Sequence, residues 1–325
     1  PDRLLFTQVG APVQQSWVIR RLGESALLTA EEGLIPMASD MIDDPKLLAR
    51  IQKALVKMLE DMDKACRELN IPYSVYRGTM IGPIRHKGFI PWDDDIDVLM
   101  TRRDYERFLA EAPALMGPMY RFDNTRTLPE YPYMFTKLGF TGTLLIPEFA
   151  KNANYRMPIC LDVLPLDTVP TDPSDFKKQS RATWLWGRLL YLTGTPTPML
   201  IDTHGVKRLA IHTATSIAYY GMKLLRVTPR RLQKLFDAAA RRYEGENTGR
   251  YTDFSMRDPE NWAVNLDEIQ PTMDVPFDGI TVQIAPAYDA MMRRTYGEYM
   301  ELPPVEQRRN HKPVEVDFGP LKGLL

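Results

Sequence analysis

The sequence contains few cysteines and histidines and no long apolar run. Its two cysteines, Cys66 and Cys160, cannot form a disulfide framework or a cysteine-based zinc site within the chain. The four histidines do not fall at the spacing of metal ligands. No run of about eighteen apolar residues occurs, which argues against a membrane-spanning helix, and the first residues lack the pattern of a secretory signal. Nothing in this composition indicates an oxidising compartment.

Several catalytic motifs are absent as well. The sequence has no G-x-G-x-x-G, P-loop, H-E-x-x-H or G-x-S-x-G pattern, which removes the motif support for dinucleotide-binding, Walker-type, zinc-protease and α/β-hydrolase chemistry. Apolar residues make up 44% and charged residues 26% of its 325 residues. These proportions are ordinary for a globular protein of one or two domains, and they exclude disordered and fibrous classes.

The most informative stretch runs from residue 73 to residue 105. Its pattern predicts a strand, a turn into a short helix, and a second strand that begins with acidic residues. Alternation along that strand would place Asp93, Asp95 and Asp97 on one face and Asp94 on the other. Three carboxylates so close together repel one another, and a divalent cation is the simplest way to offset the repulsion. These acids therefore predict a metal site.

Two other interpretations of the acidic run remain open. It could be a solvated acidic turn, although it lies between Trp92 and an apolar strand. It could also begin an EF-hand, because the first three ligand positions of that loop are matched by aspartates. The sixth position is Val98 instead of glycine and the twelfth is Asp104 instead of glutamate, so the EF-hand pattern is incomplete. A catalytic metal site is the interpretation that we favour.

Upstream of the acids, the sequence predicts a phosphate-binding turn. Gly78 and Thr79 follow a strand-like segment and open a short helix that Gly88 is expected to end. The free backbone N–H groups at the start of such a helix, together with the Thr79 hydroxyl, suit the phosphates of a donor molecule. Three basic residues are candidate partners for a pyrophosphate, with solvated surface charges as the alternative: Arg77, Arg85 and Lys87.

Two more candidates lie farther along the chain. Asp162 interrupts residues 159–164, an apolar run typical of a buried strand. A carboxylate there costs on the order of several kcal/mol unless it is paired or bound to metal, so Asp162 fits the third acid of a two-metal transferase site. Asp167 is expected to be a turn or cap residue. Lys137 lies in the strand-like residues 134–138 and is predicted either to point at the active site or to be an exposed strand charge.

These segments resemble a known family. The run Arg77-Gly-Thr-Met-Ile-Gly and the run Arg85-His-Lys-Gly-Phe-Ile-Pro-Trp-Asp-Asp-Asp-Ile-Asp are similar to the signature of the LicD family of phosphotransferases, which is related to the fukutin-related phosphotransferases. Residues 158–167 and 277–312 resemble further stretches of that family. The resemblance covers most of residues 46–312.

The resemblance implies specific roles for the candidate residues. Asp95, Asp97 and Asp162 would be catalytic and would hold Mg²⁺ or Mn²⁺, with two ions in the site, and Asp93 is a further candidate ligand. His311 is a candidate substrate contact. The donor would be a CDP-activated alcohol such as CDP-choline, from which phosphocholine or a similar phospho-alcohol is transferred. The acceptor would be a hydroxyl of a cell-surface glycan, such as lipopolysaccharide or teichoic acid, or of its lipid-linked precursor.

Two other functions fit the same residues. The protein could be a nucleotidyltransferase that attacks the α-phosphate of a nucleoside triphosphate. It could also be a non-catalytic relative that binds a glycan or a membrane and uses the acids to hold a structural cation. A comparison of CDP-choline with a nucleoside triphosphate separates the two enzymes, and metal binding without turnover favours the third function. No nucleic-acid partner is expected.

The predicted fold is α+β: a nucleotidyltransferase-like palm, with a mixed sheet flanked by helices, and an added basic helical region. Residues 1–45 are an N-terminal segment of uncertain structure, and residues 46–170 form the catalytic core. Residues 171–247 form the basic helical region. Residues 248–325 supply C-terminal strands and a helix that complete the catalytic domain.

Four residues are predicted to start helices, because each is a good N-cap or first-turn residue ahead of an apolar pattern. They are Asp44, Thr101, Asp175 and Thr228. Proline cannot donate the backbone hydrogen bond that a helix interior needs, so Pro113 is expected to end the helix that Thr101 begins. Cys66 falls in the apolar stripe of the first helix and is predicted to be a core thiol.

The net charge of −1 hides a strongly basic region. Residues 177–242 contain five lysines and eight arginines against two aspartates, a surplus of eleven positive charges. Aromatic residues lie among them, and this mixture suits an anionic membrane surface or a polyanion. In that case the protein would be cytoplasmic and attached peripherally to the inner face of the membrane. The alternative is a set of helices that pack on the catalytic core and carry their charge into water.

Overall fold

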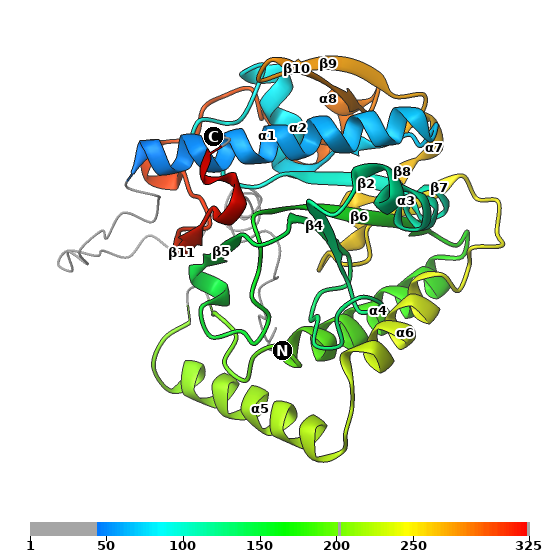
Figure 1. The fold of residues 1–325 in the computed structure, drawn as a ribbon. Helices are drawn as coiled ribbons and strands as arrows, with labels where there is room; N and C mark the ends of the chain where they lie inside the picture. The colour runs from blue at the N-terminus through cyan, green and yellow to red at the C-terminus, as the bar shows by residue number, and fades with distance from the viewer. Residues whose placement is uncertain (1–43, 201–202, 324–325) are drawn as a thin grey trace, which may run out of the picture.

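The computed structural model describes residues 44–200 and 203–323, and within them the fold is mixed α/β with eight α-helices (Figure 1). The predicted N-terminal segment, residues 1–45, lies almost wholly outside the described residues. The described part contains a seven-stranded sheet in which β1-β2-β6-β4-β3 is the main order, β7 pairs with β6, and β8 pairs with β7. These strands are β1 (Ser74–Val75), β2 (Asp97–Thr101), β3 (Tyr120–Asp123), β4 (Thr136–Phe140), β6 (Cys160–Thr168), β7 (Arg250–Thr252) and β8 (Val264–Asn265).

The sheet is mixed because β2 and β6 run parallel, whereas its other strand pairs are antiparallel. The register aligns Asp97 of β2 with Asp162 of β6, and Asp162 with Lys137 of β4. Aligned residues of neighbouring strands point to the same face of a sheet. Three strands that are far apart in sequence therefore bring two acids and one lysine into a single row.

Helix α1 (Pro45–Glu68) packs against α3 (Arg102–Met116) and the central strand β6. It begins as predicted, since the Asp44 carboxylate accepts a hydrogen bond from the Lys46 N–H and Pro45 occupies the first turn. The apolar stripe of α1 is buried, and Cys66 within it is 0% exposed. The prediction of a core thiol is confirmed, and burial raises the pKa of that thiol well above its ordinary value.

Helix α3 begins as predicted but ends later. The Thr101 hydroxyl accepts a hydrogen bond from the Asp104 N–H and caps the helix. The expected end at Pro113 is wrong, because the chain stays helical through Met116 and ends at Gly117, which has a φ of 73°. Glycine adopts this left-handed conformation without the steric cost that other residues incur, so it stops the helix where the proline does not.

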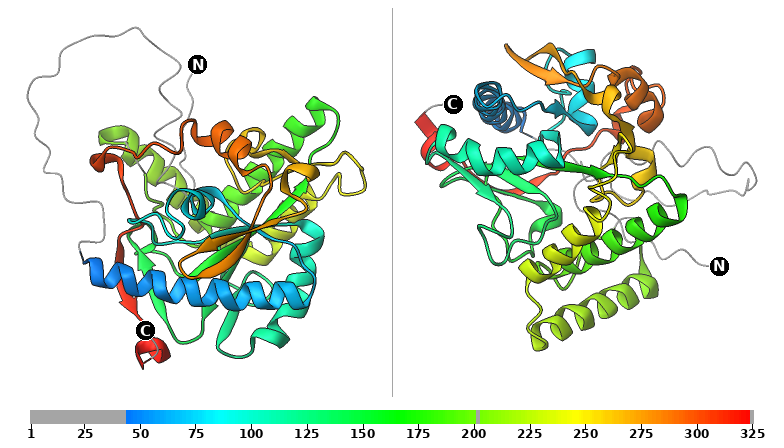
Figure 2. Two further views of the ribbon diagram at one scale, coloured as in Figure 1. Left: turned by 90° about the horizontal axis from the view of Figure 1, so that it is seen from above. Right: turned by 90° about the vertical axis from the view of Figure 1, so that its right-hand side faces the viewer.

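The helices of the basic region are α4 (Pro173–Leu192), α5 (Gly205–Leu224) and α6 (Pro229–Ala240). Helix α4 begins ahead of the predicted Asp175, because the carboxylate of Asp172 caps it by accepting from the Ser174 and Asp175 N–H groups. Helix α6 begins at the predicted cap, Thr228. Helices α4 and α6 enclose a second apolar core, and α5 lies outside them at one edge of the molecule (Figures 1 and 2).

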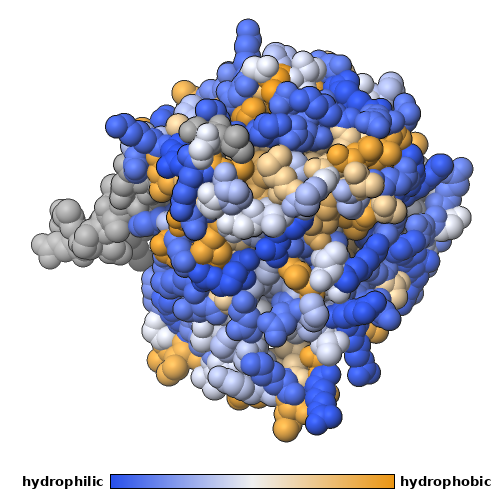
Figure 3. Space-filling view, in the orientation of Figure 1, coloured by the Kyte–Doolittle hydropathy of each residue, from blue (hydrophilic) through white to orange (hydrophobic). Residues whose placement is uncertain are grey.

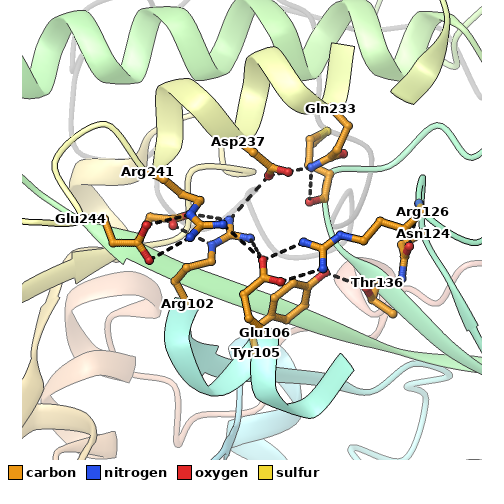
Figure 4. A network of polar contacts seen from close by, with 12 residues as sticks. Arg102, Tyr105, Glu106, Asn124, Arg126, Thr136, Gln233, Asp237, Arg241 and Glu244 are labelled. Atoms are coloured by element: carbon orange, nitrogen blue, oxygen red, sulfur yellow. Dashed lines mark hydrogen bonds and ion pairs between the residues drawn. The ribbon is translucent and has the colours of Figure 1, made fainter. Parts of the chain in front are cut away.

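Asp167 is not the turn or cap residue that the sequence predicted. It lies within β6, which continues to Thr168 because β7 pairs with its end. Its carboxylate is 2% exposed and accepts hydrogen bonds of 2.8 and 2.7 Å from the guanidinium of Arg102. That guanidinium also lies 3.5 Å from Glu106 and 3.9 Å from Asp237 of α6. Figure 4 shows how this network joins α3 to α6, so ion pairs hold the basic region on the sheet.

The C-terminal part packs back on the sheet and α1. Strands β9 and β10 form the predicted hairpin, since Asp278 and Gly279 have φ values of 44° and 84°, as a tight two-residue turn requires. Strand β11 pairs with β5. The remaining elements are β5 (Leu144–Pro147), α7 (Leu266–Ile269), β9 (Met273–Phe277), β10 (Ile280–Ile284), α8 (Tyr288–Tyr296), β11 (Pro313–Asp317) and the 3₁₀ turns Glu148–Ala150, Pro259–Trp262, Val305–Gln307 and Gly319–Gly323.

Gly88 does not end the short helix as predicted. Helix α2 (Arg77–Arg85) stops before it, and the left-handed backbone belongs to Lys87, with a φ of 58°. A Cβ atom on Gly88 would lie 2.1 Å from an oxygen of Asp278. The Asp278 carboxylate also accepts a 2.9 Å hydrogen bond from the Phe89 N–H. The glycine therefore permits a close approach that ties the segment before the acids to the β9–β10 hairpin.

Candidate active site

The acidic run lies immediately before and at the start of β2. Residues 93–96 are irregular, and the strand begins only at Asp97. Regular strand alternation therefore does not apply to residues 93–96, although Asp93 and Asp95 are neighbours as predicted: burial raises the pKa of Asp93, and the nearby Asp95 carboxylate raises it further. Asp94 and Asp95 line the same cavity, whereas Asp93 lines a neighbouring one. The polar side chains around the first cavity, which we call the acidic cavity, are Asp94, Asp95, Lys137, Asp162 and His311.

Lys137 and Asp162 form an ion pair inside the acidic cavity. The Nζ atom of Lys137 lies 2.6 Å from an Asp162 carboxylate oxygen, and the lysine is 7% exposed. Burial lowers the pKa of Lys137, but the Asp162 carboxylate more than offsets this, so the pKa is raised overall. Lys137 is therefore a buried cation beside the acids and not an exposed strand charge.

Arg77 approaches the acids from the start of α2. Its guanidinium is buried, with Nη1 3.5 Å from Asp97 and Nη2 2.8 Å from Asp253. Burial raises the pKa of Asp97 well above its usual range; Arg77 opposes this rise, and Asp95 and Asp162 add to it. Sequence reasoning missed Asp253, which follows β7 and belongs to no motif that marks it. Arg77 lies at the site as a partner of buried carboxylates.

His311 reaches the acidic cavity from the C-terminal segment. Its ring Nδ1 lies 2.9 Å from Asp94, its backbone N–H donates to the same carboxylate at 3.0 Å, and its Nε2 lies 3.8 Å from Asp95. Burial lowers the pKa of His311, but Asp94 and Asp95 raise it to about 10, so the ring is protonated at neutral pH. The structure thus brings His311 to the acids, and it assigns Asp94 a partner that the sequence did not suggest.

The predicted phosphate-binding turn also lies beside the acids. Gly78 and Thr79 are buried in the first turn of α2, whose N-cap residue, Tyr76, makes no side-chain capping bond. The Thr79 hydroxyl accepts a 3.0 Å hydrogen bond from the Asp97 N–H, so it positions the start of β2. An oxygen that accepts this bond can still donate its own proton to a ligand.

The other two basic candidates are not brought to the acidic cavity. The Arg85 guanidinium donates to the backbone carbonyls of Tyr299 and Glu301, at 2.5 and 3.1 Å, and so holds the C-terminal segment. Lys87 is exposed and lines neither cavity. Arg85 does line the neighbouring cavity that contains Asp93.

This neighbouring cavity has aromatic walls. Trp92, Tyr296 and Tyr299 line it together with Asp93 and two glutamates of the C-terminal segment. The guanidinium of Arg308 lies 4.6 Å from the centre of the Trp92 ring. Aromatic faces attract cations in this way. The lining therefore combines aromatic rings and carboxylates with the basic side chains of Arg85 and Arg309, and we call this cavity the aromatic cavity.

The charges of the site suit a divalent cation. Six carboxylates, those of Asp93, Asp94, Asp95, Asp97, Asp162 and Asp253, accompany three basic side chains, Arg77, Lys137 and His311. The buried Oδ2 atom of Asp94 has no hydrogen-bond partner among the described residues. Carboxylate oxygens are the ligands that Mg²⁺ and Mn²⁺ prefer. However, within residues 44–200 and 203–323 no three His, Cys, Asp or Glu side chains are already arranged to hold an ion.

Comparisons with known proteins first define the class of the domain. Residues 70–130, which include α2, the acidic run, β2, α3 and β3, match the family model described as the LicD/FKTN/FKRP nucleotidyltransferase domain. The chain is also 26% identical over 275 residues to lipopolysaccharide cholinephosphotransferase LicD of Haemophilus influenzae, an alignment that covers 82% of this chain and 96% of that protein. The chain thus contains a segment that matches this family model, and most of its length is similar to LicD.

Shorter similarities involve two uncharacterised rickettsial proteins. One from Rickettsia typhi is 30% identical over 73 residues, which is 22% of this chain and 24% of that protein. One from Rickettsia prowazekii is 26% identical over 78 residues, which is 24% of this chain and 29% of that protein. These matches extend over the length of a motif region only.

Proposed function

We propose that this protein transfers phosphocholine, or a similar phospho-alcohol, from a CDP-activated donor to a hydroxyl of a cell-surface glycan such as lipopolysaccharide. The observation that carries the proposal is the register of Asp97 and Asp162 on adjacent parallel strands, with Asp95 in the same acidic cavity. In this proposal the sheet is a nucleotidyltransferase-like palm. The choice of phosphocholine and of lipopolysaccharide rests on the name of the Haemophilus influenzae relative.

We assign metal binding to Asp95, Asp97 and Asp162, with Asp93 as a further candidate. A divalent cation bound there would neutralise charge on the donor pyrophosphate and align the acceptor hydroxyl. The Nζ atom of Lys137 lies 2.6 Å from an Asp162 carboxylate oxygen. A metal ion that binds Asp162 would therefore have to share this carboxylate with Lys137. Arg77 holds Asp97 in place from the opposite side, with its Nη1 atom 3.5 Å away.

The transfer step follows from these assignments. The oxygen of the acceptor hydroxyl bonds to the phosphorus that carries choline, and the bond from that phosphorus to the bridging oxygen breaks. CMP leaves, and the hydroxyl proton passes to Asp162. Backbone N–H groups at Gly78 and Thr79, at the positive end of α2, hold the donor phosphates.

The aromatic cavity is our candidate for the choline head group. A quaternary ammonium binds well against aromatic faces, and carboxylates add long-range attraction. The Arg308 guanidinium lies over the Trp92 ring, so choline would have to displace it or use the other rings of the cavity, those of Tyr296 and Tyr299. Uncharged alcohols such as ribitol or glycerol would lack the attraction that aromatic rings and carboxylates exert on a cation. The lining of the aromatic cavity therefore favours a cationic head group.

A donor assay with purified protein tests the function. We expect release of CMP from CDP-choline in the presence of Mg²⁺ or Mn²⁺ and a glycan acceptor, and loss of that release when a chelator removes the metal. CDP-glycerol, CDP-ribitol, CTP and ATP serve as comparison substrates. Release of pyrophosphate from CTP or ATP would instead identify a nucleotidyltransferase. Metal binding without any turnover would identify a non-catalytic relative.

Donor binding can be measured separately from turnover. A ligand that binds only the folded protein raises its stability by RT ln(1 + [L]/Kd), which is about 2.7 kcal/mol at a hundred times Kd. We therefore expect a metal-dependent rise in melting temperature with CDP-choline that exceeds the rise with CDP-glycerol. Equal shifts for the two donors would contradict the assignment of the aromatic cavity to choline.

Replacing Lys137 with methionine tests the role of its ion pair. Because Lys137 competes with a metal ion for Asp162, we expect the variant to need less Mn²⁺ for half of its full thermal shift. We also expect its kcat to fall, since the buried cation no longer holds Asp162 in place. The matched control is Lys64→Met on α1, where the lysine side chain is 62% exposed and pairs with Glu60. An unchanged Mn²⁺ requirement in Lys137→Met would exclude competition at Asp162.

A further inference from the structure

Helix α5 is apolar on two opposite faces. Its inward face packs on the rest of the protein through Ile211, Thr215 and Tyr219, which are at most 5% exposed. The Thr215 hydroxyl donates to the Pro196 carbonyl at 2.9 Å. The outward face carries a second apolar stripe, whose members are separated by three, eight, three and four residues and so lie on one side of the helix: Val206, Leu209, Ile217, Tyr220 and Leu224. A helix that needed only to pack on the core would have polar residues there.

The outward stripe is the most exposed apolar surface in the described part of the chain. In the whole described part of the chain, seven large apolar side chains are at least 61% exposed. Six of these seven lie on α5 or directly after it. Val206 and Leu224 are both 84% exposed. Figures 1 and 2 place α5 at the outer edge of the molecule, and Figure 3 shows apolar atoms along that edge. Apolar surface gathered in this way marks an interaction site.

The segment that carries the stripe is basic, although Glu130 lines a pocket together with Tyr219 and Lys223 of α5. Residues 203–236 contain no aspartate or glutamate. They contain seven exposed basic residues: Lys207, Arg208, Lys223, Arg226, Arg230, Arg231 and Lys234. A second copy of this face is a poor partner, because two such surfaces would bring like charges together. The complementary partner is apolar inside and anionic at its surface.

We propose that the outward face of α5 binds an anionic lipid membrane, with the helix lying in the plane of the interface. The apolar stripe would enter the boundary between head groups and acyl chains, and the flanking lysines and arginines would contact lipid phosphates. No helix in the described residues is long and apolar enough to cross a bilayer. The proposed attachment lies along one side of α5, and it does not depend on the proposed transferase activity.

Helix α5, and not the basic region as a whole, carries the proposed membrane surface. Helices α4 and α6 mainly pack on the protein, and Tyr191 and Tyr219 are core residues with 8% and 5% exposure. These aromatic residues do not form part of a membrane surface. Among these three helices α5 has the most exposed apolar side chains, since Trp184 and Leu185 on α4 are 38% and 43% exposed whereas Val206 and Leu224 are both 84% exposed.

Vesicle co-sedimentation tests the proposal with the whole chain. We expect the protein to pellet with vesicles of phosphatidylcholine and phosphatidylglycerol, and to pellet much less with phosphatidylcholine alone or at high salt. The double variant Leu209→Asp/Leu224→Asp should lose at least tenfold of its vesicle affinity. Replacing Lys207 or Arg208 with glutamine should lower affinity about fivefold for each charge removed.

The control variant is Leu115→Asp, a similar change at a 43% exposed leucine on α3, and it should bind vesicles as the parent protein does. Circular dichroism checks that each variant keeps its helices. Equal binding by the double variant and the parent, or equal binding to neutral and anionic vesicles, would overturn the proposal. A change from dimer to monomer in the double variant, with vesicle binding unaltered, would assign the stripe to a second copy instead.

Discussion

Replacing Asp95 with asparagine is expected to lower kcat for phosphocholine transfer by on the order of a hundredfold to a thousandfold while leaving the melting temperature nearly unchanged. Losses of this size follow the removal of a single group that stabilises transition-state charge. Asp95 is the most accessible of these acids to test, because its side chain is 36% exposed and its ion-pair partner, His311 Nε2, is 3.8 Å away. The fold does not rely on it.

The measurement pairs turnover with binding. Asp95→Asn should also need more Mg²⁺ or Mn²⁺ for half of its remaining activity, because a neutral amide holds a divalent cation less well than a carboxylate. The control is Asp267→Asn, at an exposed aspartate in the first turn of α7. A variant that keeps its rate and its metal requirement would remove Asp95 from the mechanism, whatever the result for Asp162.

Replacing Arg102 with methionine is expected to cost about 3–5 kcal/mol of folding free energy. Breaking a buried ion pair by removing one partner has this effect because it leaves the other charge uncompensated. Here the partner is Asp167, which is 2% exposed and accepts two hydrogen bonds from the Arg102 guanidinium. The change also removes one link between α3 and Asp237 of α6. Urea unfolding measures the loss.

The matched control is Arg293→Met on α8. Arg293 also pairs with two acids, Asp289 at 3.0 Å and Glu298 at 2.7 Å, but its side chain is 46% exposed. Exposed ion pairs contribute roughly 0–1 kcal/mol, so this variant should be nearly as stable as the parent. Equal losses in the two variants would show that burial of the Arg102 pair has no special effect on stability.

Local chemistry in the sequence was sufficient to predict many elements. Asp44 and Pro45 marked the start of α1, Thr101 and Thr228 capped α3 and α6, and Asp278-Gly279 marked a hairpin. Each of these signals acts over a few residues, so the chain does not need its tertiary partners to express it. The same is true of the family resemblance, whose residues lie mostly within one contiguous stretch.

The acidic run shows that short-range sequence patterns do not predict where a strand begins. Alternation would separate Asp94 from Asp95, but β2 begins only at Asp97, and both residues line the acidic cavity. The start of a strand depends on when a partner strand becomes available for hydrogen bonding, and here the partner is β6, about sixty residues later. Asp162 illustrates a more general rule: an acid within an apolar run needs a partner wherever the strand lies, and here Lys137 pairs with it.

The sequence by itself determined the acidic motif, the acid within an apolar run, the family resemblance and most helix starts, because these depend on residue type and short spacing. Only the tertiary structure decided which charges meet. The contacts of Lys137 with Asp162, Arg77 with Asp253, and Arg102 with Asp167 join elements that are distant in sequence. The same packing decided which face of α5 is left uncovered. Burial sets the free energy of a charge or an apolar side chain, and burial is a property of the assembled fold.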